Sequence, residues 1–184
     1  MPATPWVLVA LAAVATTLPT SAASHDLDSS MPVLRAYVAA MAANDCELVW
    51  RLTSSEVKLH RPSDTPQFHE AICRTVRRMH ETGVDEDLGK PVAYLADGNQ
   101  RAVFVPSKRL SGAFGFASVT DLMYVVYSHD GGVSWEVLDL ACVDSRWVRL
   151  VFPAYRDDPL LPVDRARQQL WLPNDLDWFM LTKQ

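Results

Sequence analysis

The residues best suited to chemistry lie at helical spacing in the middle of the chain. His69, Glu70 and Cys73 form the pattern H-E-x-x-C, which differs at one position from the H-E-x-x-H motif of zinc metalloproteases. On a helix, residues 69 and 73 share one face, and imidazole and thiolate are both competent zinc ligands. The second histidine is missing, however, and His80 lies two turns further along. We therefore interpret Cys73 as a core or disulfide-bonded cysteine, and we expect neither a metal nor another cofactor.

Three cysteines, Cys46, Cys73 and Cys142, are far apart in the chain and form no C-x-x-C pair. In an oxidising compartment two of them could form a disulfide and leave the third free, so three pairings are possible. Cys73 and Cys142 both fall on core-facing positions of the expected elements, which favours that pair. The alternative is three buried thiols that act as small hydrophobic residues.

Residues 128–135 read S-H-D-G-G-V-S-W and form the sharpest local motif. The aspartate can accept hydrogen bonds from turn amides, the glycines permit a tight turn, and the tryptophan can pack beneath the hairpin. This segment resembles the Asp-box of sialidases and other β-rich proteins, in which the box is usually structural and repeated. Because the pattern occurs once here, we expect it to staple a hairpin rather than to take part in glycan chemistry.

The elements that must position these residues begin with helices. The pattern predicts helices over residues 31–43, 46–52 and 66–82, and a short strand over residues 55–60. Thr65 and Pro66 are typical of a helix start, and Gly83 is typical of a helix end. Val57 and Leu59 alternate with charged residues, which is typical of a strand.

The second half of the chain changes to strand periodicity. Strands are expected over residues 91–96, 101–105, 118–128 and 133–142. The turn residues 97–99 and 129–132 connect them as hairpins, and residues 106–116, which include Gly112 and Gly115, are expected to form a loop. Helices that precede an antiparallel sheet indicate an α+β fold.

The order of elements resembles the nuclear transport factor 2-like superfamily, which includes ketosteroid-isomerase-like proteins. The resemblance covers residues 31–152 and rests on this order, on the opening stretch MPVLRAYVAAMAANDCELVWRL and on the closing stretch SWEVLDLACVDSRWV. It implies a cone-like fold in which N-terminal helices pack on a curved, mainly antiparallel sheet and leave a pocket. Such pockets occur in enzymes, transport adaptors and binding modules, so the fold alone does not give the function.

The resemblance also implies candidate pocket residues. A ketosteroid-isomerase-like enzyme needs a carboxylate in an apolar pocket, where desolvation raises its pKa enough for proton transfer. Asp121 and Asp139 alternate with apolar residues and are the candidates for this general base, while Tyr37, His60 and Tyr124 could donate or accept hydrogen bonds. The opposite strand face is equally apolar, so both aspartates could instead lie on the outer face of the sheet.

Length and composition bound the remaining possibilities. The chain has 184 residues, of which 49% are hydrophobic, and carries a net charge of −5, which suits a single domain with a good core. A negative net charge argues against a nucleic-acid partner, because phosphates are bound by basic surfaces. No apolar run approaches the roughly 20 residues that span a bilayer.

The amino terminus predicts export. Residues 1–23 carry no charged side chain and contain the apolar run WVLVALAAVA, whose length of about ten residues is typical of a signal-peptide core. Small residues at positions 21–23 favour cleavage after Ala23, or else after Ala22. No Lys or Arg precedes the run, so a buried N-terminal helix is the alternative. The predicted organisation is a signal peptide over residues 1–23, a leader over 24–30, the α+β domain over 31–153 and an extension over 154–184.

Three functions are compatible with these sequence features. The first is a non-enzymatic binding domain, periplasmic or secreted, for a small ligand or a protein partner, with a homodimer as one form of that partner. The second is an isomerase- or dehydratase-like enzyme that uses Asp121 or Asp139 as its base. The third is an envelope interaction or inhibitor protein whose tail, residues 154–184, carries the recognition. An inhibitor would also need a protruding rigid loop, for which residues 106–116 are the candidate. We expect the first.

Overall fold

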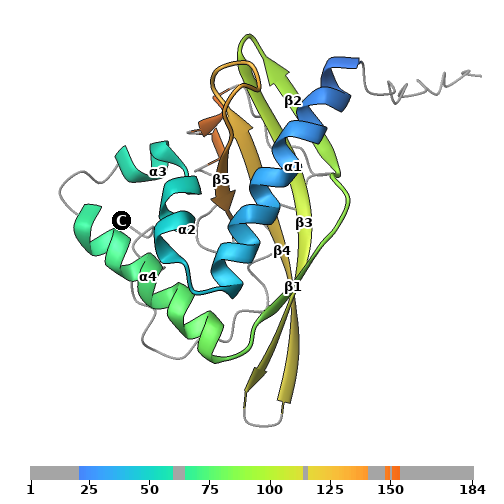
Figure 1. The fold of residues 1–184 in the computed structure, drawn as a ribbon. Helices are drawn as coiled ribbons and strands as arrows, with labels where there is room; N and C mark the ends of the chain where they lie inside the picture. Colours follow the sequence, from blue (N-terminus) through green and yellow to red (C-terminus); the bar gives the residue numbers. More distant parts are fainter. Residues whose placement is uncertain (1–20, 60–64, 114–115, 141–147, 150, 154–184) are drawn as a thin grey trace, which may run out of the picture.

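The computed structural model describes residues 21–59, 65–113, 116–140, 148–149 and 151–153. It shows helices packed on a curled antiparallel sheet (Figure 1). The expected α+β class, with N-terminal helices and a curved sheet, is therefore confirmed. His60, Cys142, the apolar run near the amino terminus and residues 154–184 lie outside the described residues.

Four helices lie in the described part of the first half of the chain. They are α1 (Ser21–Ala42), α2 (Cys46–Leu52), α3 (Ser55–Leu59) and α4 (Thr65–Glu81). Helix α1 begins well before the expected start at residue 31, so Pro32 lies inside the helix rather than in its first turn. Tertiary contacts explain the extension, because Asp26 and Ser30 in this supposed leader are both buried. No helix in the described ranges is both long and apolar enough to cross a bilayer.

Residues 55–59 form helix α3, so the strand expected over residues 55–60 is wrong. The Ser54 hydroxyl accepts a hydrogen bond from the Val57 amide at 3.2 Å, which caps the helix. The Glu136 carboxylate accepts a second one from the Ser55 amide at 2.7 Å. These oxygens satisfy first-turn amides that a helix leaves without partners. Alternation of Val57 with charged residues could not reveal a cap supplied by a distant strand.

Among the described residues, the sheet contains five antiparallel strands. They are β1 (Asp85–Leu88), β2 (Ala93–Asp97), β3 (Gln100–Ala113), β4 (Phe116–Ser128) and β5 (Glu136–Asp139). The order is β1-β3-β4-β5, and β2 pairs with β3 on the same edge as β1. Between β1 and β2 the Gly89 amide donates to the Pro106 carbonyl at 2.8 Å. Because proline has no N–H, Pro106 cannot donate a hydrogen bond back to this edge. The edge therefore divides into two strands at this point.

The loop expected over residues 106–116 is wrong as well. Strands β3 and β4 pair without interruption from Arg101↔Ser128 to Ala113↔Phe116, and their hairpin projects from the body of the molecule (Figure 1). Glycine is unfavourable in strands, but the long antiparallel register outweighs this cost. Strand β5 is also shorter than the strand expected over residues 133–142, and the acidic strand β1 was not expected at all.

The two faces of the sheet are both buried. Val103 and Val105 of β3 pack with helix α1 on one face, whereas Ala102 and Phe104 pack with Val151 and other residues on the opposite face. Figure 1 shows α1 lying across the sheet. Because successive side chains of a strand alternate between faces, this arrangement decides which strand residues can reach the helices.

Candidate ligand-binding site

A buried polar cluster lies on the face of the sheet that α1 covers. Its members come from four strands: Glu86 from β1, Arg109 from β3, Tyr124 from β4 and Asp139 from β5. Glu86 is the register partner of Arg109, and Tyr124 is the register partner of Asp139. Pairing across the sheet therefore brings together residues that are more than fifty positions apart in sequence.

Arg109 joins the two carboxylates of this cluster. Its Nε and Nη2 both lie 3.0 Å from Glu86 Oε2, and Nη2 also lies 3.5 Å from Asp139 Oδ2. The side chains of Glu86 and Asp139 are only 4% and 6% exposed. A buried charge is tolerated only when it is paired and hydrogen-bonded, and the guanidinium supplies that pairing.

Tyr124 completes the network as both donor and acceptor. Its hydroxyl donates to Glu86 Oε1 at 2.5 Å and accepts from Arg109 Nη2 at 3.0 Å. Burial raises the pKa of Tyr124 well above its usual value, and the negative charge of Asp139 raises it further. The phenol therefore keeps its proton at physiological pH. The ring of Tyr37, on α1, packs edge-on against it with 6.0 Å between ring centroids.

Glu86 has no lone pair left for a substrate in this arrangement. Its Oε1 accepts from the Ser107 hydroxyl at 2.6 Å as well as from Tyr124, and its Oε2 accepts two N–H groups of Arg109. A carboxylate oxygen has about two acceptor sites. Glu86 is thus a structural anchor, and proton abstraction by it would require the network to open.

An open groove of about 350 Å³ lies beside the cluster. Its walls are the last two turns of α1, the end of α4 and strand β1. It is lined by apolar side chains and three charged ones: Arg35, Val38, Ala39, Met41, Ala42, Met79, Val84, Asp85, Glu86 and Leu88. Glu86 belongs to both the groove and the polar cluster. The groove therefore offers apolar walls, with charged groups from α1 and β1.

The structure brings together some of the pocket residues expected from the sequence. Tyr37, Tyr124 and Asp139 meet in the cluster, whereas the Asp121 side chain is exposed and opposite Lys108 in the projecting hairpin. Sequence reasoning missed Glu86, Arg109 and Ser107. Extending the alternation of the strand that contains Val103 and Val105 would have pointed to residues 107 and 109. The acidic run around Glu86 carried no comparable signal.

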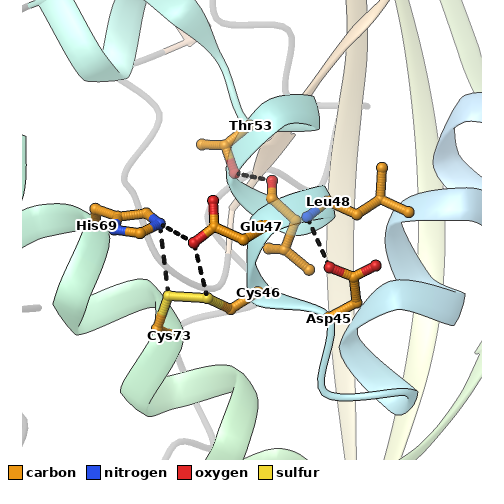
Figure 2. The surroundings of a disulfide bond; sticks show 8 residues. Asp45, Cys46, Glu47, Leu48, Thr53, His69 and Cys73 are labelled. Atoms are coloured by element: carbon orange, nitrogen blue, oxygen red, sulfur yellow. Dashed lines mark hydrogen bonds and ion pairs between the residues drawn. A yellow bond between two sulfur atoms is a disulfide. The ribbon is translucent and has the colours of Figure 1, made fainter.

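The disulfide joins Cys46 to Cys73, so the expected Cys73–Cys142 pair is wrong. Cys46 is the first residue of α2, and Cys73 lies on the face of α4 that packs against α2 (Figure 2). The Asp45 carboxylate caps α2 by accepting the Leu48 amide at 3.0 Å. Reasoning about core-facing positions could not choose between pairings, because helix packing decides which sulfur atoms meet.

The hairpin between β4 and β5 has the local geometry expected from its residues. Asp130 Oδ1 accepts the amides of Val133 and Ser134 at 3.1 and 2.9 Å, and Asp130 Oδ2 accepts the Ser134 hydroxyl at 2.6 Å. These bonds hold the pKa of Asp130 well below its usual value. Trp135 Nε1 lies 3.1 Å from both the Gly132 carbonyl and the Ser29 hydroxyl. The hairpin thus also holds helix α1.

No family model, curated protein or solved structure matches this chain.

Proposed function

We propose that the protein is a non-enzymatic binding domain whose ligand is a small, largely apolar molecule held in the groove between α1, α4 and β1. The observation that carries the proposal is the groove of about 350 Å³, which falls within the range of roughly 300–1,000 Å³ common for small-molecule sites. Such sites combine apolar walls with a few polar groups that orient the ligand. Val38, Met41 and Met79 supply apolar walls here, and Arg35 and Asp85 supply polar groups.

The polar cluster supports binding better than it supports catalysis. A general base needs a lone pair directed at the proton that it removes, and both oxygens of Glu86 are already occupied. Asp139, the remaining candidate base, is buried against Arg109. Tyr124 donates its hydroxyl hydrogen bond to Glu86, so this donor is not available to a substrate. The isomerase- or dehydratase-like alternative would require this network to rearrange before every turnover.

The proposal includes a place in the nuclear transport factor 2-like superfamily and export from the cytoplasm. The order of helices and strands and the curled sheet support the former. The disulfide and the apolar run in residues 1–23 support the latter, because disulfides persist in oxidising compartments. Residues 106–116 no longer support an inhibitor that acts through a rigid loop, since most of them belong to paired strands.

A titration with the uncharged apolar fluorophore N-phenyl-1-naphthylamine tests the groove. We expect saturable binding to the full chain, with one probe bound per chain. The variant Ala39→Trp fills the groove with an indole ring and should weaken binding by at least about tenfold. Ala39 is exposed, so the fold should tolerate this substitution.

The matched control is Ala96→Trp, an exposed position on β2 that does not line the groove. It should bind the probe as the unmodified chain does. Equal affinity of the Ala39→Trp variant and the unmodified chain, or a complete lack of saturable binding by the latter, would contradict the proposal.

A further inference from the structure

We propose that reduction of the Cys46–Cys73 disulfide turns its surroundings into a zinc site, in which the two thiolates, His69 and Glu47 are the ligands. The inference is independent of the groove, because none of these residues lines it. Figure 2 shows Glu47 and His69 directed at each other beside the two sulfur atoms. The motif H-E-x-x-C supplies two of the four ligands, and the first turn of α2 supplies the other two.

Three distances between ligand atoms are close to those of a tetrahedral zinc site. With Zn–S near 2.3 Å and Zn–N or Zn–O near 2.0–2.2 Å, neighbouring ligand atoms stand about 3.3–3.8 Å apart. His69 Nε2 lies 3.6 Å from Cys73 Sγ and 3.2 Å from Glu47 Oε1, while Cys46 Sγ lies 4.0 Å from Glu47 Oε1. All four ligand atoms lie within 4.8 Å of one another. The two sulfur atoms, bonded in the disulfide, are the pair that must separate.

The helices already hold these side chains in place. His69 and Cys73 are one turn apart on α4, and the ring of Trp50 on α2 packs edge-on against His69 with 5.0 Å between centroids. The Asp45 carboxylate fixes the first turn of α2, which carries Cys46 and Glu47. The His69 and Glu47 side chains are 31% and 72% exposed, so an ion can reach the site from solvent.

The donor set selects the class of metal. Thiolate and imidazole favour zinc and similar soft or borderline cations, whereas calcium and magnesium prefer oxygen ligands alone. Reduction of the disulfide consumes two electrons and two protons, which a dithiol supplies as it becomes a disulfide itself. Binding of Zn²⁺ then displaces the two thiol protons to solvent. The ion thereby replaces the covalent link between α2 and α4.

Cobalt(II) provides a direct probe of the site, because it reports coordination geometry that spectroscopically silent zinc does not. The full chain is prepared with Cys142→Ser, so that Cys46 and Cys73 are its two remaining cysteines. It is reduced with a phosphine, which becomes a phosphine oxide, and is then desalted without oxygen. We expect one equivalent of Co²⁺ to give intense tetrahedral d–d bands and a thiolate-to-cobalt charge-transfer band. One equivalent of Zn²⁺ should abolish both.

Variants identify the two ligands that are not cysteine. His69→Ala should lower the cobalt affinity by about 100-fold or more, and Glu47→Gln by at least about tenfold, with the charge-transfer band retained. The control Glu70→Gln removes an exposed carboxylate beside His69 that pairs with Arg74 instead, and it should bind cobalt as the parent does. Circular dichroism of each reduced chain reports whether it is folded.

The oxidised chain should show neither band. The proposal is overturned if the reduced parent, folded or not, gives no tetrahedral cobalt spectrum, or if its affinity is the same after His69→Ala.

Discussion

Arg109 is the residue on which the polar cluster depends. Its guanidinium contacts Glu86 and Asp139, whose side chains are nearly inaccessible to water, as well as the Tyr124 hydroxyl. Removing one partner of a buried ion pair leaves an uncompensated charge, which is more costly than the pair is stabilising. We therefore expect the folded state to depend on Arg109, which pairs with both buried carboxylates.

We expect Arg109→Met to lower the free energy of unfolding by about 3–5 kcal/mol, because it leaves both carboxylates buried without a cation. Urea denaturation measures the change. The matched control is Lys108→Met, an exposed neighbour on the same strand, which should change stability by less than about 0.5 kcal/mol. A loss for Arg109→Met no larger than that of the control would show that the cluster is not a stabilising ion-pair network.

At the scale of elements, helix α1 is positioned by contacts at its amino-terminal end. Asp26 Oδ2 accepts a hydrogen bond from the Tyr94 hydroxyl on β2 at 2.5 Å and lies 3.3 Å from Arg101 Nε on β3. A Cβ atom on Gly132 would lie 2.6 Å from Asp26 Oδ1, so the glycine lets the β4–β5 hairpin approach closely. These contacts make residues 24–30 part of the domain instead of a separate leader.

The bond between Tyr94 and Asp26 gives a pH-dependent prediction. Burial and this hydrogen bond raise the pKa of Tyr94 to about 12, above the unfolded value of about 10. The stabilisation is therefore fully present below pH 10 and is lost as the pH rises through about 12. We expect Tyr94→Phe to cost about 1 kcal/mol at pH 8, and we expect this difference from the unmodified chain to shrink above pH 10. Urea denaturation across that range measures it.

A double-mutant cycle with Asp26→Asn isolates the pair. If the effects of Tyr94→Phe and Asp26→Asn are additive at pH 8, the hydrogen bond does not hold α1 to the sheet edge.

At the scale of the whole molecule, the disulfide connects the two helices that lie beside α1. Cys46 and Cys73 are 27 positions apart, and a loop of this length is worth about 3–4 kcal/mol in the chain-entropy model. Helices α2 and α4 pack mainly on one another and on α1, which in turn packs on the sheet. The cross-link thus stabilises the layer that forms two walls of the groove, and it does so only where thiols are oxidised.

We expect the protein recovered after export to begin at Ser24 and to contain a closed Cys46–Cys73 bond, with Cys142 free. Intact-mass measurement and non-reducing peptide mapping check both points. Replacing Cys46 and Cys73 with Ser should lower the melting temperature, whereas Cys142→Ser should leave it nearly unchanged. A mature chain that retains residues 1–23, or a bond from Cys73 to Cys142, would contradict this prediction.

Local patterns along the chain were sufficient for the features whose stabilising contacts are local. Helices α2 and α4 follow from apolar spacing and capping residues, and the two turns follow from Gly98 and from Asp130 with its glycines. The α+β class follows from the order of these elements. The contacts that stabilise these helices and turns join residues close together in the sequence. The spacing of residue types is therefore enough to predict them.

The site depended on contacts between distant parts of the chain. Glu86 acquires a role because β1 pairs with β3 beside Arg109, and Asp139 faces α1 because of the register between β4 and β5. Cys46 meets Cys73 because α2 packs on α4. Both sheet faces are buried, so alternation alone could not say which face a strand residue occupies. Long-range pairing and packing made that choice, and with it they decided which residues line the groove and which surround the sulfur atoms.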